Sequence, residues 1–369
     1  MEKIKVMLVF GTRPETIKMA PLVKELKARP EFETLVCVTA QHRQMLDQVL
    51  NAFQIVPDYD LDIMKPGQTL SDITARVLQG LEGVIQKEKP RMVLVHGDTT
   101  TTFAGALAAY YCQTAVGHVE AGLRTYDKYS PYPEEMNRQF VGCVADLHFA
   151  PTGRSKANLL AEGKRPERIV VTGNTAIDAL QTTVRQDYSD PLLSWAAGSR
   201  LIVVTAHRRE NLGEPMHRMF RAIRRVVEEF PDVKAVYPVH LNPLVQKAAQ
   251  EELGHCPQIR LVEPLEVVEF HNLLARSHLI LTDSGGIQEE APSLGKPVIV
   301  LRDTTERPEG VEAGTLKLAG TDEETIYTLV RQLLTEEAEY QRMGQASNPY
   351  GDGRASQRIA DAIAAYFAG

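Results

Sequence analysis

Residues 4–40 read IKVMLVFGTRPETIKMAPLVKELKARPEFETLVCVTA, and this stretch decides the fold. The short apolar runs at 4–10 and 34–40 resemble buried strands, and the stretch at 14–28 between them has a helical pattern. A strand, a helix and a second strand in this order predict a βαβ unit in a parallel sheet.

The same alternation continues along the chain. Further apolar runs lie at 91–97, 114–120 and 146–152, and helical patterns lie near 42–52, 69–88, 100–112 and 134–145. A second series of runs follows at 168–173, 201–206, 233–239, 258–264, 278–284 and 296–302. Two such series predict an α/β protein with two Rossmann-like, doubly wound domains.

We expect an N-terminal domain over residues 1–172 and a C-terminal, nucleotide-binding domain over residues 173–353. The Ala-rich helix expected at 354–369 could pack back on the first domain. In open α/β sheets ligands bind beyond the carboxyl ends of the strands, so we expect the two domains to face each other across a cleft that holds the site.

The composition is that of an ordinary globular protein, with 369 residues and 43% hydrophobic content. The net charge of −7 argues against non-specific binding to nucleic acid or to an anionic membrane. No apolar run approaches the roughly 20 residues of a membrane span, and the N-terminus lacks signal-peptide features. These features predict a cytoplasmic protein.

No metal site is predicted. The four cysteines have no paired spacing, and the histidines form no HExxH pattern. The acidic segment DYDLD at 58–62 is more typical of solvated edge residues than of a metal-binding pair.

Charged residues follow the first strand. The segment GTRPETIKMAP at 11–21 places Arg13 and Lys18 at the start of a helix, which suits an anion such as a diphosphate. Solvated charges on an ordinary strand–turn–helix are the alternative. The segment matches neither GxGxxG nor GxxxxGK[ST], which counts against a tightly held NAD and against a P-loop.

Three more strand ends carry ionisable groups. Asp98 follows one strand, where it either serves the site or caps the next helix, and Glu120 follows another. His207 follows a strand of the second series, either as a general acid or base or as part of a surface loop.

The segment LTDSGGIQEEAPSLGKP at 281–297 is the strongest signal for a ligand. The backbone N–H groups of Ser284, Gly285 and Gly286 would point out of the helix start toward a phosphate. Glu290 suits ribose hydroxyls better than a phosphate, and Arg307 could reach the same anion. The cluster predicts a nucleoside diphosphate site.

These motifs together resemble the bacterial non-hydrolysing UDP-N-acetylglucosamine 2-epimerases over nearly the whole chain. The matching segments, in the family's order, are GTRPETIKMAP, TAQHRQML, HGDTTTT, HVEAGLRT, PYPEEMNR, GNTAIDAL, AHRREN, YPVHLNP, DSGGIQEEAPSLGKP and TTERPE. The resemblance implies the two-domain GT-B fold, interconversion of UDP-GlcNAc and UDP-ManNAc, and no need for a metal or NAD.

The resemblance also implies residue roles. Asp98, Glu120 and Glu134 would be the acid/base carboxylates, and His207 the catalytic residue of the second domain. The UDP-binding residues would be Arg13, Lys18, Phe270, Ser284, Gly285, Gly286, Glu290 and Arg307. A regulatory UDP-GlcNAc site would comprise Gln41, His42, Glu134, Arg208 and His240. Asp127 and Glu135 are expected to have surface or capping roles.

The resemblance implies an elimination of UDP that leaves a 2-acetamidoglucal, followed by re-addition, in a homodimer that supplies a cell-surface polysaccharide. Its regulatory pattern favours the reversible enzyme. The alternatives are a hydrolysing epimerase that releases ManNAc and UDP, a GT-B glycosyltransferase with a separate acceptor, and a sensor that binds a nucleotide sugar without turnover.

Overall fold

The computed structural model describes residues 3–40, 43–65, 67–305 and 307–368, without the side chains of 43–45. The chain divides into two compact units: unit 1 comprises Met1–Thr182 with Tyr350–Gly369, and unit 2 comprises Thr183–Pro349. The division expected at 172/173 falls just before α7 (Thr175–Thr183).

Unit 1 contains a seven-stranded sheet in which every paired strand is parallel. The strand order is β3-β2-β1-β4-β5-β6-β7. The strands are β1 Ile4–Phe10, β2 Phe32–Val38, β3 Tyr59–Asp60, β4 Met92–His96, β5 Ala115–Val119, β6 Leu147–Ala150 and β7 Ile169–Val171. The order reverses between β1 and β4, so the loops that leave these two strands are neighbours.

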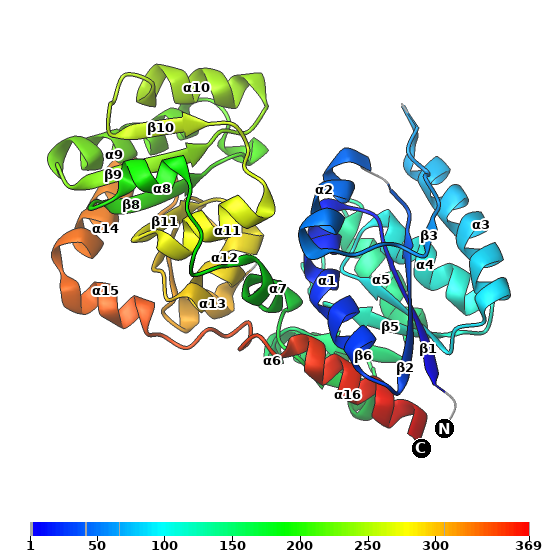
Figure 1. Ribbon diagram of the computed structural model, residues 1–369. Helices are drawn as coiled ribbons and strands as arrows, with labels where there is room; N and C mark the ends of the chain where they lie inside the picture. Colours follow the sequence, from blue (N-terminus) through cyan, green and yellow to red (C-terminus); the bar gives the residue numbers. More distant parts are fainter. Residues whose placement is uncertain (1–2, 41–42, 66, 306, 369) are drawn as a thin grey trace. The chain divides into compact units, whose positions relative to one another are not determined.

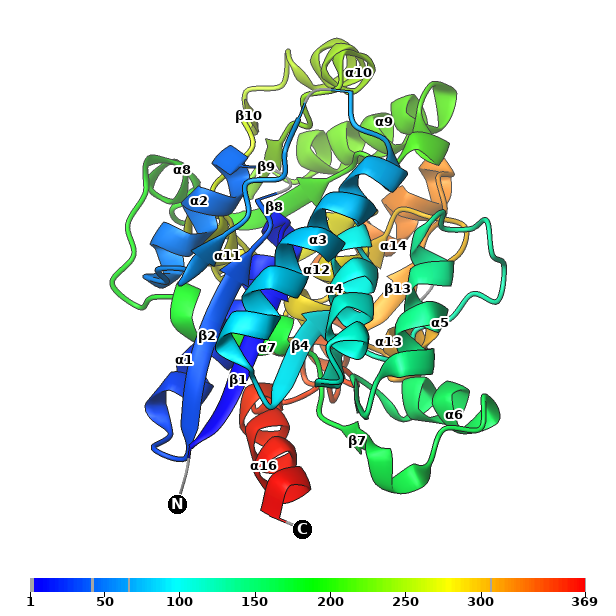
Figure 2. The same cartoon turned by 90° about the vertical axis from the view of Figure 1, so that its right-hand side faces the viewer.

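Helices separate the strands of unit 1 as predicted (Figure 1). They are α1 Arg13–Ala28, α2 Arg43–Phe53, α3 Leu70–Glu88, α4 Thr100–Tyr111, α5 Glu134–Val144, α6 Gly153–Ala161, α7 and α16 Ala355–Ala368. The C-terminal helix α16 packs against α1 (Figure 1). Helices α3 and α4 pack side by side over the sheet (Figure 2).

Unit 2 contains a six-stranded parallel sheet in the order β10-β9-β8-β11-β12-β13. Its strands are β8 Arg200–Thr205, β9 Val233–Pro238, β10 Ile259–Val262, β11 Leu279–Thr282, β12 Val298–Val300 and β13 Leu316–Leu318. Its α-helices are α8 Pro191–Ala196, α9 Glu214–Glu229, α10 Pro243–Leu253, α11 Val267–Arg276, α12 Gly285–Glu290, α13 Pro308–Glu312, α14 Glu323–Thr335 and α15 Glu337–Gly344. Here the order reverses between β8 and β11.

The prediction of two doubly wound parallel α/β domains is confirmed, with one strand placed differently. The run at 168–173 opens the second series of apolar runs in the sequence, but β7 pairs with β6 at the edge of the first sheet, within residues 1–172 expected for the first domain. Sequence reasoning also missed β13, because its three residues are too short to show a periodicity.

Successive side chains along a strand alternate between the two faces of a sheet, and both faces of the second sheet are covered by helices. In β8, Ile202 and Val204 join the core that contains α9, α10 and α14. Leu201 and Val203 join the core on the other face. This explains why the strands read as continuous apolar runs. No helix in the described part of the chain is long and apolar enough to cross a membrane.

Two buried histidines make the stability of unit 1 depend on pH in the acid range. His118 and His148 are neighbours on paired strands, and burial lowers the pKa of His118 to about 3 and that of His148 to about 4. The Nε2 of His118 lies 2.7 Å from the carbonyl of Gly97, so Nε2 donates this hydrogen bond. The lowered pKa keeps the ring neutral near pH 7. An unfolded histidine binds a proton below about pH 6.5, so these side chains favour folding above that pH and lose this contribution on acidification.

We therefore predict that His118→Asn makes stability less dependent on pH. Between about pH 6.5 and 4.5 the slope of unfolding free energy against pH should fall by roughly 1.4 kcal/mol per pH unit, the value for one proton. The measurement is urea unfolding by circular dichroism at several pH values. The exposed His255 provides the control, since His255→Asn should keep the wild-type slope. An unchanged slope in His118→Asn would contradict a neutral buried ring.

Candidate active site

The turn after β1 has no room for a side chain at its first residue. A Cβ at Gly11 would lie 1.9 Å from the Thr39 hydroxyl oxygen. The backbone N–H groups of Gly11 and Thr12 both donate to one carboxylate oxygen of Glu15, at 3.1 and 2.8 Å. The turn is therefore held rigidly, and Arg13 begins α1 directly beyond it.

Glu15 joins this turn to the loop after β4. Its second carboxylate oxygen accepts hydrogen bonds from the hydroxyls of Thr99 at 2.7 Å and Thr102 at 3.2 Å. Glu15 is 3% exposed, and burial raises its pKa although these hydrogen bonds oppose the shift. The strand-end loops that carry Arg13 and Asp98 thus share one buried acceptor.

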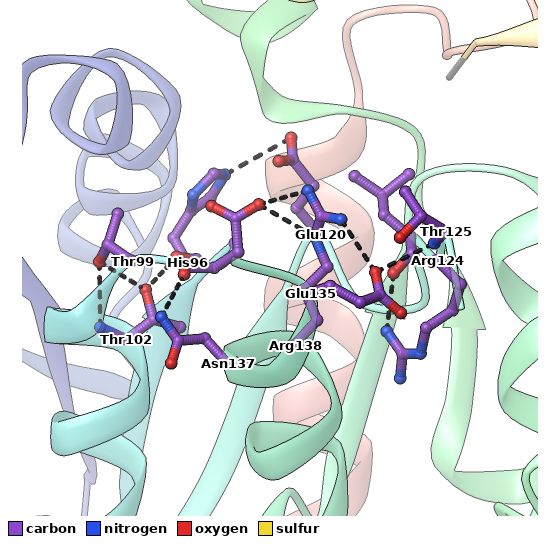
Figure 3. A network of polar contacts seen from close by, with 12 residues as sticks. His96, Thr99, Thr102, Glu120, Arg124, Thr125, Glu135, Asn137 and Arg138 are labelled. Atoms are coloured by element: carbon purple, nitrogen blue, oxygen red, sulfur yellow. Dashed lines mark hydrogen bonds and ion pairs between the residues drawn. The ribbon is translucent and has the colours of Figure 1, made fainter. Parts of the chain in front are cut away.

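Asp98 is held by an arginine. The Nε and Nη2 atoms of Arg138 donate to the same carboxylate oxygen of Asp98 at 2.9 and 2.6 Å, and Asn137 donates to its carbonyl at 2.8 Å (Figure 3). The alternative interpretation of Asp98 as a helix cap is wrong. Thr99 is the N-cap of α4, because its hydroxyl accepts the N–H of Thr102.

Glu120 follows β5 in the left-handed backbone region, with φ of 63°. Such a conformation in a non-glycine residue persists only where its surroundings hold it. One oxygen of its carboxylate forms an ion pair with Lys18 and accepts a hydrogen bond from the Asn174 amide at 2.8 Å. The Nε2 of His96 lies 3.8 Å from the same oxygen (Figure 3). Lys18, expected at a diphosphate, is thus paired with a carboxylate in this structure.

Glu134 and Glu135 open α5 and have different surroundings. The Oε2 atom of Glu134 is buried and has no hydrogen-bond partner among the described residues. Glu135 is fully buried, not at the surface, and accepts the backbone N–H groups of Thr125 and Tyr126 at 3.0 and 3.1 Å. Burial opposes ionisation of Glu135, but these hydrogen bonds outweigh it and lower its pKa. Glu135 caps the preceding loop, while Asp127 is exposed and its carboxylate accepts the N–H of Tyr129.

In unit 2, His207 follows β8 and lies beside a buried aspartate. Its Nδ1 atom is 3.1 Å from Oδ1 of Asp283, which follows β11. The other oxygen of Asp283 accepts the backbone N–H groups of His207 and Arg208 at 2.8 and 2.9 Å. Burial opposes ionisation of Asp283, but the adjacent His207 ring and the two backbone N–H groups lower its pKa.

The turn Ser284–Gly286 begins α12, as predicted. The N–H of Ser284 donates to the Thr282 hydroxyl at 2.9 Å, so this group does not point outward as expected. Arg307 donates to the buried Glu289 at 2.7 Å, and its guanidinium covers Gly285, where a Cβ would lie 2.7 Å from Nη1. Arg307 therefore lies at the turn, where the sequence placed it.

Glu290 ends α12, and its Oε2 atom lies 3.5 Å from Nε2 of the buried His271. The other ring nitrogen of His271 bonds the Thr183 hydroxyl at 2.7 Å. Phe270, half-buried, has its ring centroid 6.4 Å from that of His271. Glu290 and Phe270, the two residues predicted to bind the nucleoside, thus both lie beside the imidazole of His271.

The residues predicted for a regulatory site are described in part. Gln41 and His42 lie outside the described residues. The exposed His240 stacks on His207, with ring centroids 5.7 Å apart and planes 16° apart. Arg208 is adjacent to His207 in sequence, and its Nε donates to the Asp283 carbonyl at 3.2 Å.

Sequence reasoning missed the residues that hold the predicted ones. They are Glu15, His96, Arg138, Asn174, Asp283 and Glu289. Two of them had a signal. Thr12 followed by Glu15 is the spacing of a capping box, and Asp283 follows an apolar run as Asp98 does. The others are recognisable only from tertiary contacts.

Comparison with known proteins identifies a matching family. The family model Epimerase_2, UDP-N-acetylglucosamine 2-epimerase, matches residues 24–364. A UDP-N-acetylglucosamine 2-epimerase from Bacillus subtilis (strain 168) is 68% identical over 363 residues, which cover 98% of this chain and 96% of that protein.

Solved structures agree with this match. A crystal structure of a UDP-N-acetylglucosamine 2-epimerase has a TM-score of 0.93 and 64% identity, covering 100% of this chain and 97% of that one. The UDP-GlcNAc 2-epimerase from Neisseria meningitidis bound to UDP-GlcNAc has a TM-score of 0.89 and 49% identity, covering 98% of this chain and 100% of that one.

We predict that Glu15→Ala destabilises unit 1 by about 3 kcal/mol or more, because it leaves several buried donors without an acceptor. Hydrogen exchange of unit 1 peptides across a urea series measures this. Glu25, on the same helix but half-exposed, is the matched control, and Glu25→Ala should cost less than about 1 kcal/mol. Equal losses in the two variants would show that Glu15 does not hold the loops.

Proposed function

The chain belongs to the UDP-N-acetylglucosamine 2-epimerase family, and on this premise we propose that it interconverts UDP-GlcNAc and UDP-ManNAc reversibly, without net hydrolysis. The Neisseria relative, which was solved with UDP-GlcNAc bound, supports this choice of substrate. In this proposal both sugars are released still attached to UDP, and no free ManNAc is formed.

The proposed route avoids the weak acidity of the C2 proton by coupling its loss to departure of UDP. A base takes the C2 proton, the C1–C2 double bond forms, and the C1–O bond breaks with its electron pair moving to the phosphate oxygen. A proton then adds to the opposite face of C2, and the same phosphate oxygen re-forms its bond to C1. The intermediate is a 2-acetamidoglucal.

The proton transfers require acid/base groups on two sides of C2, and we assign them to Asp98, Glu120 and Glu134. One observation carries the proposal: the Oε2 atom of Glu134 is buried without a hydrogen-bond partner in the described part of the chain. A buried carboxylate oxygen without a partner costs free energy unless a ligand satisfies it. The other two carboxylates are paired with Arg138 and Lys18.

The leaving diphosphate needs cations and N–H donors as its charge develops. We assign this role to Arg13, Lys18 and Arg307, with the turn Ser284–Gly286, in which the N–H groups of Gly285 and Gly286 would be the donors because that of Ser284 is bonded to Thr282. The position of Arg307 over Gly285 supports its part in the group. Glu290 would accept hydrogen bonds from the ribose, Phe270 would lie at the uridine, and His207 would be the catalytic residue of unit 2.

We also propose a regulatory UDP-GlcNAc site formed by Gln41, His42, Glu134, Arg208 and His240. The stacking of His240 on His207 supports this site. A ligand bound at His240 would lie next to the ring that packs on the catalytic imidazole of His207, and so could influence it. The family resemblance further supports a homodimer that works in cell-surface polysaccharide synthesis.

Incubation with UDP-GlcNAc in D₂O, without an acceptor, tests the reaction. NMR should show UDP-ManNAc that carries deuterium at C2, because the proton that returns comes from solvent. Free ManNAc with UDP would instead indicate the hydrolysing alternative. A substrate pool unchanged after long incubation at high enzyme concentration would contradict epimerase activity of either kind.

A second prediction concerns Glu134→Gln, which removes a charge but keeps the shape of the side chain. It should lower kcat by at least about 100-fold while leaving the circular dichroism spectrum unchanged, because the amide cannot transfer the proton. The exposed Asp127 in the same loop is the control, and Asp127→Asn should keep kcat within about twofold. Near-normal turnover in Glu134→Gln would remove Glu134 from the mechanism.

A further inference from the structure

Asp283 lies where β11 ends, fully buried, and has no role in the reaction proposed above. Its Oδ2 atom accepts three hydrogen bonds from the loop after β8. They come from the N–H groups of His207 at 2.8 Å and Arg208 at 2.9 Å and from the Asn211 amide at 3.2 Å. Its Oδ1 atom is buried, accepts no hydrogen bond of regular geometry among the described residues, and lies 3.1 Å from Nδ1 of His207.

This arrangement determines which nitrogen of His207 carries a proton. Donors surround Asp283, and they hold its pKa below the ordinary value, so the carboxylate is ionised and only accepts. Nδ1 is the ring nitrogen that lies 3.1 Å from this unpaired acceptor, so a hydrogen on Nδ1 can satisfy it, whereas a lone pair there would face the carboxylate. A neutral ring therefore favours the hydrogen on Nδ1, which leaves the lone pair on Nε2.

The remaining contacts keep the ring in this orientation. Asn211 is buried and also donates to the Leu301 carbonyl at 3.1 Å, which fixes the amide that holds Asp283. His240 stacks on one face of the imidazole. The side chain of His207 is nevertheless 38% exposed, so a ligand can reach it from solvent.

We propose that Asp283 is a positioning residue that holds His207 with Nδ1–H directed at its carboxylate, so that Nε2 is the atom that accepts or returns a proton at the substrate. The functional half of this proposal rests on the proposed function, whereas the protonation of Nδ1 rests on the surroundings of Asp283 and does not depend on that function. Asp283 acts through His207 and does not itself touch the substrate.

Asp283→Asn tests the proposal with little change of shape. The asparagine oxygen can still accept the backbone N–H groups of residues 207 and 208, while its NH₂ group faces Nδ1 of His207. A donor at that place forces Nδ1 to accept and moves the ring proton to Nε2. The variant thus keeps the loop and reverses the tautomer.

The first readout is the position of the ring proton of His207. It is measured by ¹H–¹⁵N NMR of ¹⁵N-histidine-labelled protein at about pH 8.5, where an ordinary imidazole is neutral. The His207 signals are assigned by their loss in His207→Gln. We expect the proton on Nδ1 in the wild type and on Nε2 in Asp283→Asn. Asp232→Asn should leave the wild-type pattern, because Asp232 precedes β9 and pairs with Arg200 at the amino end of β8. A wild-type proton on Nε2, or the same tautomer in both proteins, overturns the proposal.

The second readout is kcat for interconversion of UDP-GlcNAc and UDP-ManNAc. Asp283→Asn should lower kcat at least about tenfold in the wild-type background but less than about twofold further in His207→Gln, because the two residues act as a unit. An equal loss in both backgrounds would show a merely structural role and overturn the proposal. If the chain does not epimerise UDP-GlcNAc at all, the NMR readout still decides the tautomer, and only the proposed function fails.

Discussion

A buried carboxylate that joins two neighbouring strand-end loops by hydrogen bonds is the interaction on which the candidate site depends. Such a carboxylate lies in each unit at the place where the strand order reverses. In unit 1, Glu15 joins the loops after β1 and β4, and in unit 2, Asp283 joins the loops after β8 and β11. Parallel strands bring their carboxyl ends to one edge, but loops there are irregular and have N–H groups without partners. Each carboxylate satisfies several of these donors at once and so determines where the functional side chains point.

Pairing with cations and hydrogen-bond donors also explains how several buried or partly buried carboxylates coexist in unit 1. A charge removed from water is tolerated only where it is paired or hydrogen-bonded. Asp98 has Arg138, Glu120 has Lys18 and Asn174, and Glu135 has the backbone of the preceding loop. The buried Oε2 atom of Glu134 has no partner among the described residues. The paired carboxylates therefore stabilise the structure, whereas the unpaired oxygen of Glu134 is available to accept a hydrogen bond from a ligand.

Sequence reasoning recognised residues by their position after an apolar run and by motif. That criterion selected Arg13, Asp98, Glu120, His207 and the Ser284–Gly286 turn, because a strand end is visible as the end of hydrophobicity. It gave Glu135 a surface or capping role, because a carboxylate at a helix start resembles a solvated one until the loop that folds over it is seen. It passed over Arg138 and Asn174, because each reaches its partner across tens of residues.

The sequence by itself determined the two parallel α/β units and the family, because periodicity and motif order are local properties of the chain. Only the tertiary structure decided which carboxylates are paired, that Thr99 and not Asp98 caps α4, that β7 belongs to the first sheet, and which nitrogen of His207 faces Asp283. The reason is physical: a hydrogen bond requires two atoms to lie within about 3 Å. For residues far apart in the chain, that distance depends on how the whole unit packs.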